Sequence, residues 1–136
     1  MKGFVSAGIE RVFPPFNAYK ADTEANKARF EDFLLVPVSE DVNNIYCFDD
    51  AIGIDTGYLF AFNCSRATAE KIIERLALRS DTVYFDHPYK VIYEFEWWDE
   101  ERVGNLSEYN WSDGQSYRFY WYDEENQKSY YYTFSM

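Results

Sequence analysis

The stretch Gly57–Leu78 constrains the fold more than any other part of this 136-residue chain. Its first half alternates between two sets of apolar residues, with Tyr58, Phe60 and Phe62 in one set and Leu59 and Ala61 in the other. A period of two is that of a β-strand, in which successive side chains point to opposite faces of the sheet. Because both sets are apolar, we expect a central strand covered on both faces.

The second half of this stretch has the spacing of an amphipathic helix. Apolar residues recur every three or four positions, at Ala67, Ala69, Ile72, Ile73 and Leu76. Ser65 precedes them, and a serine hydroxyl at this place accepts a hydrogen bond from a free amide of the first turn. A helix N-terminus can also bind an anion, but the glycines that let a phosphate approach are missing here. We therefore interpret Ser65 as a helix cap.

The remaining periodic segments predict the rest of the architecture. They are a helix from Asp22 or Thr23 to about Leu35, strands at Val42–Phe48, Val91–Trp98, Ser116–Tyr122 and Lys128–Phe134, and a loop at Gly104–Asp113. The last two strands are joined by five residues, which is typical of a β-hairpin. We expect a single α+β domain over residues 1–136, with one mostly antiparallel sheet of about five strands and two helices packed on one face. The other face is expected to be rich in Tyr, Trp and Glu and partly open.

The net charge of −11 limits the classes of partner. Phosphate backbones and anionic membrane surfaces would repel such a chain, which argues against ordinary nucleic-acid or membrane binding. A basic protein would be attracted and steered toward it, although acidity also serves solubility alone. Aromatic residues make up 21% of the sequence, and this content excludes a disordered chain.

Recognisable catalytic motifs are absent from the sequence. His87 is the only histidine, which leaves few acid–base dyads and excludes most histidine-based metal sites. There is no P-loop, G-x-G-x-x-G, C-x-x-C or G-x-S-x-G motif. Asp49, Asp50 and Asp55 lie near glycines, but their spacing is not that of an EF-hand, and we interpret them as a solvated turn. The sequence thus predicts that the protein is not an enzyme and holds no metal ion or cofactor.

Two further features bear on cross-links and compartment. Cys47 and Cys64 lie in or at the end of predicted strands among aromatic residues, so we expect buried thiols. A disulfide is conceivable if their strands pair, but a domain of this size does not require one. The first sixteen residues contain no long apolar run. We expect a cytoplasmic protein without a membrane span, or an envelope protein if an N-terminal signal has been removed.

The main local charge feature is an acidic run at the end of the expected strand Val91–Trp98. The alternation places Val91, Tyr93, Phe95 and Trp97 on one face and Ile92, Glu94, Glu96 and Trp98 on the other. Acids beside aromatic rings suit a basic protein partner, and they also suit a sugar, a glycosidase-like carboxylate pair or a plain solvated face. We assign partner binding to Glu94, Glu96, Trp98, Asp99, Glu100 and Glu101, with Tyr120 and Tyr122 if the hairpin pairs beside this strand.

Several short motifs support a resemblance over residues 36–136. They are Val36–Ser39, Asn44–Tyr46, Gly53–Asp55, Trp97–Trp98, Tyr122–Glu124 and Tyr130–Tyr132. Their arrangement resembles small uncharacterised bacterial domains, some of them lipoprotein-like, and in general style the immunity proteins of bacterial toxin systems. The resemblance implies no catalytic residues. A lipoprotein relative would carry an N-terminal signal and a lipobox cysteine, and this sequence shows neither.

These observations lead to two functional hypotheses. The first is a non-enzymatic acidic binding protein, specifically a bacterial immunity protein that blocks the active site of a basic toxin domain by electrostatic steering and aromatic anchors. The alternative is a small envelope-associated domain that binds a ligand or a sugar through Trp97 or Trp98.

Overall fold

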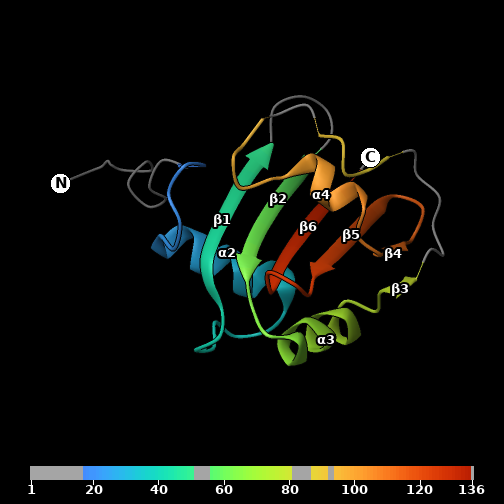
Figure 1. Cartoon of the computed structure of the whole chain (residues 1–136). Helices are drawn as coiled ribbons and strands as arrows, with labels where there is room; N and C mark the ends of the chain where they lie inside the picture. The colour runs from blue at the N-terminus through green and yellow to red at the C-terminus, as the bar shows by residue number, and fades with distance from the viewer. Residues whose placement is uncertain (1–16, 51–55, 81–86, 92–93, 136) are drawn as a thin grey trace.

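One antiparallel sheet and two substantial helices form the computed structural model, which describes residues 17–50, 56–80, 87–91 and 94–135 (Figure 1). The helices are α2 (Glu24–Leu34), α3 (Arg66–Arg75) and the short α4 (Glu100–Gly104). The strands are β1 (Asn43–Asp50), β2 (Thr56–Asn63), β3 (Arg79–Ser80), β4 (Glu108–Ser112), β5 (Ser116–Asp123) and β6 (Lys128–Ser135). They follow the order β1-β2-β6-β5-β4-β3 in the sheet. The predicted α+β class is confirmed. The sheet has six described strands where about five were expected, and one of them, β3, has only two residues.

Strand β2 lies inside the sheet, as its apolar alternation predicts. It pairs with β1 on one side and with β6 on the other, and both pairings are antiparallel. Phe60 and Phe62 are fully buried toward the helices, whereas Leu59 and Ala61 are buried on the opposite face. The hairpin between β5 and β6 is also confirmed, with Asp123 facing Lys128 at its closed end.

Helices α2 and α3 cover one face of the sheet, with α2 running behind β1 and β2 in Figure 1. Phe30 of α2 meets Phe62 edge-on with ring centroids 4.9 Å apart. The predicted caps are confirmed, because the Asn26 amide donates to Thr23 Oγ1 at 3.0 Å and the Thr68 amide donates to Ser65 Oγ at 3.3 Å. Each cap satisfies one amide that the first helical turn leaves free.

Asp41, just before β1, anchors the start of α3. Its carboxylate accepts from the Ser65 amide at 2.9 Å, from Ser65 Oγ at 2.8 Å and from Thr68 Oγ1 at 2.7 Å. A hydrogen bond from the Ser39 hydroxyl, together with those from Thr68 and Ser65, holds the pKa of Asp41 well below its usual range. The contact ties two elements 24 residues apart, so local sequence does not predict it.

The second face of the sheet is covered as well, which corrects the expectation of a partly open face. The cover comes from residues 17–20 and from the segment that ends in α4, and α4 lies in front of the sheet in Figure 1. Phe95, Trp97, Trp98 and Val103 are all buried on this face. The fold is therefore a sheet between two unequal layers, one of helices and one mainly of irregular chain.

The expected strand Val91–Trp98 is wrong for the residues that can be described there; Ile92 and Tyr93 lie outside them. The segment crosses the sheet instead of joining it, and the Trp98 amide closes a turn onto the Phe95 carbonyl at 3.0 Å. Alternation persists from Glu94 to Trp97 and ends at this turn, so Trp97 and Trp98 are both buried in the same layer.

The expected loop Gly104–Asp113 is also wrong, because it contains β4. Trp111 faces Arg118 of β5, and the Arg118 guanidinium lies 4.2 Å from the centre of the Trp111 ring. Asn110 is buried, and its amide donates to Glu108 Oε2 at 2.7 Å. Asn110 is a polar residue at the centre of this five-residue strand, so the sequence lacks the apolar pattern that would predict a strand here. Its hydrogen bonding within the fold offsets the cost of burying its amide.

Both cysteines are buried free thiols, so no disulfide joins them. Burial raises the pKa of Cys47 far above its usual range and that of Cys64 to about 11. The expected solvated turn is wrong for Asp49 and Asp50, which lie at the end of β1 opposite Tyr58 and Gly57 of β2. Asp55 and residues 1–16, on which the turn and compartment expectations partly depend, lie outside the described residues. Among the helices that the structure describes, none has the length and apolar character needed to cross a membrane.

Candidate partner-binding surface

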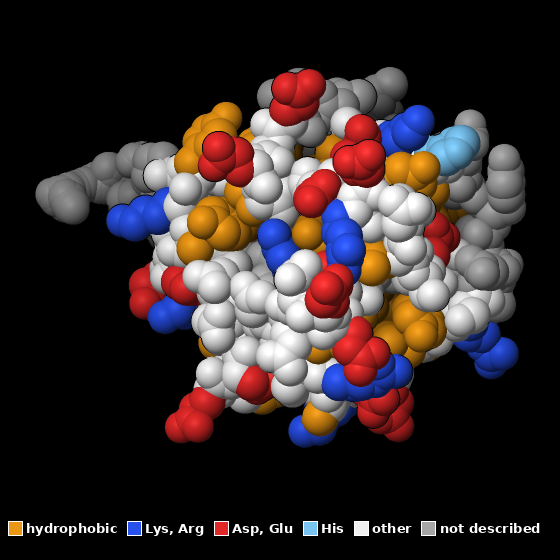
Figure 2. Space-filling view, in the orientation of Figure 1, with side chains coloured by type: hydrophobic (Ala, Val, Ile, Leu, Met, Phe, Trp, Pro, Cys, Tyr) orange, Lys and Arg blue, Asp and Glu red, His pale blue; other side chains and the backbone are white. Residues whose placement is uncertain are grey.

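The eight residues assigned to partner binding lie in three different environments. The exposed ones are Glu94, Glu96, Asp99, Glu100 and Glu101. Trp98 and Tyr120 are buried, and Tyr122 is half-buried. Only the exposed carboxylates thus remain together on one side of the molecule, around and above α4, where Figure 2 shows several acidic side chains.

Trp98 and Tyr120 belong to the interior, which corrects their assignment to the surface. Trp98 packs edge-on against Trp121 and Tyr130, with centroid distances of 5.9 and 5.5 Å, and its indole N–H donates to the Tyr89 carbonyl. Tyr120 lies on the opposite face of the sheet, and its hydroxyl is 2.6 Å from Ser129 Oγ. Burial of these large rings stabilises the two cores, so neither ring is available to a partner.

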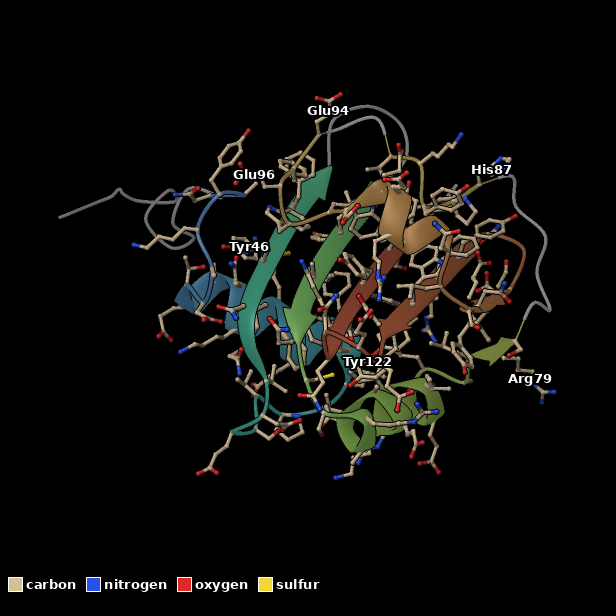
Figure 3. All side chains as sticks on the ribbon, in the orientation of Figure 1. Tyr46, Arg79, His87, Glu94, Glu96 and Tyr122 are labelled. Carbon is tan, nitrogen blue, oxygen red and sulfur yellow. The ribbon has the colours of Figure 1, made fainter. Side chains whose placement is uncertain are left out.

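Tyr122 does not adjoin the exposed acids either. Its hydroxyl donates to the Cys64 carbonyl at 2.9 Å, on the face that carries the helices. In Figure 3, Tyr122 lies beside α3, whereas Glu94 lies at the far end of the molecule. The hairpin does not pair beside the Glu94 segment, because that segment crosses over the sheet, and the condition for including Tyr120 and Tyr122 is not met.

Glu94 and Glu96 border a hollow of about 550 Å³ on the second face, which we call the Glu94 hollow. Its lining residues are Tyr19, Tyr46, Glu94, Glu96, Trp97 and Lys128. Glu96 lies next to β1, which carries Tyr46 (Figure 3). The two acids point outward because Phe95 and Trp97, which alternate with them, are buried against the sheet. Local alternation therefore places both carboxylates at the rim.

Aromatic rings form the floor and one wall of the Glu94 hollow. Tyr46 stacks on Trp97 with centroids 5.6 Å apart and planes 9° from parallel, and Phe95 stacks on Trp97 at 4.8 Å. Tyr19 meets Phe95 edge-on at 5.8 Å and is 78% exposed. The Trp97 indole N–H donates to the Ala18 carbonyl at 2.7 Å, which fixes the segment that carries Tyr19. The hollow thus combines a stiff floor with one exposed ring.

Sequence reasoning did not identify Tyr19, Tyr46 and Lys128 as part of this site. Tyr19 is 75 positions away from Glu94, and only the crossing of the 94–97 segment over β1 brings them together. No short motif connects such residues. Nothing in the local pattern distinguishes Tyr46 from the other tyrosines of the sheet.

The charges of the Glu94 hollow are only partly balanced. Within the described ranges, neither Glu94 nor Glu96 forms an ion pair, and Lys128 is the one cation of the lining. The Lys128 ammonium lies 5.1 Å from the centre of the Tyr130 ring. Its partial burial lowers the pKa of Lys128, while Asp99 and Asp123 act in the opposite direction. The rim is therefore left with an excess of negative charge.

The acids of α4 have local structural roles. The side chain of Asp99 caps the helix by accepting from the Arg102 amide at 3.1 Å. Glu100 and Glu101 occupy the first turn, where the positive end of the helix dipole favours carboxylates. All three side chains are exposed and extend the negative surface beside the Glu94 hollow.

A second hollow, which the sequence did not predict, lies between α3 and the end of the β5–β6 hairpin. This Arg102 cleft has a volume of about 470 Å³, with Ile73, Leu106, Tyr109 and Tyr122 among its lining residues. In contrast to Glu94 and Glu96, its carboxylates are paired. Arg66 of α3 forms ion pairs with Glu70 and with Glu124 of the hairpin turn.

Arg102 bridges two carboxylates of the same turn. Its Nε and one terminal nitrogen donate to the two oxygens of Asp123, both at 2.8 Å, and that nitrogen also reaches Glu125 at 2.8 Å. Asp123 is only 1% exposed, and the Arg102 guanidinium lowers the pKa of Asp123 to about 2. A bidentate pair with a buried carboxylate holds α4 to the hairpin.

The remaining chemical groups are distant from these acids. His87 is exposed, meets Tyr89 edge-on at 5.6 Å, and lies on the other side of the molecule from Glu96 in Figure 3. Of the residues with described positions, no three His, Cys, Asp or Glu are gathered as metal ligands. The arrangement around Glu94 and Glu96 is suited to binding a cationic group by charge and ring contacts.

Comparisons with protein-family models, with curated proteins and with solved structures found no match to this chain.

Proposed function

We propose that this protein is a non-enzymatic acidic binding protein that neutralises a basic protein partner, in the manner of a bacterial immunity protein acting on its toxin. The observation that carries the proposal is the Glu94 hollow, where two exposed carboxylates without an ion pair among the described residues border a floor of stacked aromatic rings. Interfaces use such rings as anchors and complementary charge to select a partner.

The overall charge supports the same proposal. A net charge of −11 attracts a basic partner over distances of about a Debye length, roughly 10 Å at 0.1 M salt. Glu100 and Glu101 extend the negative surface beside the hollow, so a partner drawn to this side meets charge first and aromatic rings next. The bound protein would then block the active site of the partner without chemically altering the partner.

The alternative, sugar binding through Trp97 or Trp98, has no comparable support. Both indoles are buried, at 6% and 4% exposure, and both indole N–H groups donate to backbone carbonyls. A sugar-binding tryptophan offers an accessible ring face to the ligand, and neither ring does so here.

The proposal is tested by capture of a partner on immobilised wild-type protein and on the variant Glu94→Lys/Glu96→Lys. We expect the wild type to retain a basic protein at low salt, with much weaker retention at about 0.5 M salt, where the Debye length is only a few ångström. The charge-reversed variant should lose that protein. Co-expression of the wild type should then protect cells from the toxicity of the captured protein.

The matched control is Glu40→Lys/Glu74→Lys, which makes the same change in net charge at two exposed positions outside the hollow. Retention by this control close to the wild-type level would locate binding at the Glu94 hollow. Equal loss in both variants would mean that only total charge matters. Absence of any retained basic protein, or a retained protein whose activity is unaffected by this chain, would overturn the proposed function.

A further inference from the structure

The chain contains its own examples of arginine recognition. Arg102 bridges Asp123 and Glu125, two carboxylates separated by one residue, with all contacts at 2.8 Å. Arg118 lies over the Trp111 ring at 4.2 Å. These are the two ways in which a guanidinium is preferred to an ammonium, since its planar fork reaches two carboxylate groups and its flat face stacks on a ring.

The Glu94 hollow has the same two components but no arginine among its lining residues. Glu94 and Glu96 are again separated by one residue, and Tyr19, Tyr46 and Trp97 supply the rings. Tyr19 is 78% exposed, so its ring is open to contact with a ligand. The cation that lines the hollow, Lys128, lies against the Tyr130 ring and forms no ion pair with either glutamate.

We infer that the Glu94 hollow receives one arginine side chain of the partner, with its guanidinium stacking on the exposed Tyr19 ring and attracted by the rim carboxylates Glu94 and Glu96. This inference rests on the proposed function and specifies the group that the partner inserts. Lys128 shares the hollow with the arriving guanidinium and repels it. Removal of the Lys128 charge should therefore strengthen binding, whereas a merely structural role of Lys128 would leave binding unchanged or weakened.

The test uses a small peptide, acetyl-Gly-Arg-Gly-amide, titrated into the full-length protein and followed by the NMR signal of the Trp97 indole N–H. Two matched peptides carry lysine or citrulline in place of arginine; citrulline keeps the shape of the side chain and removes its charge. We expect arginine to bind in the millimolar range, lysine several-fold more weakly and citrulline at least about tenfold more weakly, because charge and planarity both contribute.

Three variants of the protein sharpen the test. Glu94→Gln/Glu96→Gln should weaken arginine binding at least about tenfold, and Lys128→Met, which keeps an unbranched apolar chain, should strengthen it about threefold. Glu40→Gln/Glu74→Gln, which removes the same charge at two exposed positions outside the hollow, should change binding less than about twofold. One-dimensional NMR spectra of each variant confirm that it is folded.

Absence of binding by the arginine peptide overturns the inference, as does equal binding of citrulline or lysine, or an unchanged affinity in Glu94→Gln/Glu96→Gln. These outcomes can be separated from failure of the proposed function. If partner capture depends on Glu94 and Glu96 while the peptide does not bind, the arginine assignment fails and the binding function stands. If the peptide binds but no partner depends on these residues, the proposed function fails.

Discussion

Two pairs of carboxylates in this protein have the same sequence spacing and opposite surroundings. Asp123 and Glu125, at the end of β5 and in the following turn, are bridged by Arg102 of α4. Glu94 and Glu96 are exposed at the rim of an aromatic hollow and form no ion pair with a described residue. The comparison teaches that spacing alone does not assign a role to an acidic pair. The buried Asp123 and the internal Arg102 indicate a stabilising pair, whereas the exposed Glu94 and Glu96 beside aromatic rings are the pair for which we propose binding.

The largest expected effect comes from breaking the internal pair. Asp123→Asn should lower the free energy of unfolding at pH 7 by about 3 kcal/mol, because it removes a buried charge and places amide hydrogens against the Arg102 donors. Urea denaturation measures this change. Glu125→Gln is the control, since Glu125 is 77% exposed and its loss should change stability by less than about 0.5 kcal/mol. Equal effects of the two variants would contradict the assignment.

The stability of the internal pair should depend on pH in a defined direction. Arg102 lowers the pKa of Asp123 in the folded state to about 2, below its ordinary value of 3.8. The stabilisation is therefore complete above about pH 4 and is lost as the pH falls through 2; it amounts to about 2 kcal/mol. Urea midpoints at pH 7, 4 and 2.5 should show the wild-type advantage over Asp123→Asn becoming smaller with acid. A constant difference would exclude this origin.

A smaller effect should follow from loosening the floor of the Glu94 hollow. Trp97→Phe removes the 2.7 Å hydrogen bond to the Ala18 carbonyl and part of the buried ring. We expect a loss of about 1.5 kcal/mol in the free energy of unfolding, because the carbonyl loses its partner and a small cavity remains. Thermal and urea unfolding measure it. Unchanged stability would show that the indole does not hold the segment that carries Tyr19.

The smallest effect on stability is expected at the exposed pair itself. Glu94→Gln/Glu96→Gln should change the free energy of unfolding by less than about 0.5 kcal/mol, because both side chains are exposed and neither forms an ion pair in the described part of the chain. Urea denaturation of this variant in parallel with Asp123→Asn provides the direct comparison. A loss similar to that of Asp123→Asn would mean that the two pairs do not differ as described.

Several elements follow from local patterns in the sequence. The alternation of Tyr58, Phe60 and Phe62 correctly predicts an inner strand, and the position of Ser65 correctly predicts a cap. The two strands of the β5–β6 hairpin were also predictable, because a short connection between alternating runs leaves few other arrangements. In the candidate site, the same alternation correctly separates the exposed Glu94 and Glu96 from the buried Phe95 and Trp97.

Other features were beyond such patterns. Alternation through Val91–Trp98 is shared by a strand and by an irregular segment laid over a sheet, and the turn at Trp98 distinguishes them only in the fold. Tyrosine is a common anchor residue at interfaces, yet Tyr120 is fully buried. Its hydroxyl is hydrogen-bonded to Ser129 across the hairpin, which satisfies this polar group inside the core. Burial of a tyrosine depends on whether a distant group satisfies its hydroxyl.

The sequence by itself determined the α+β class, the caps of α2 and α3, the inner position of β2 and the acidity of the surface, since each depends on neighbours within a few residues. Only the tertiary structure decided which acids are paired, which tyrosines are accessible, and that Tyr19, Tyr46 and Lys128 meet Glu94 and Glu96. The physical reason is that pairing and burial depend on groups brought together from distant parts of the chain. The same two-residue spacing of carboxylates gives an internal clamp beside Arg102 and an open rim beside Tyr19.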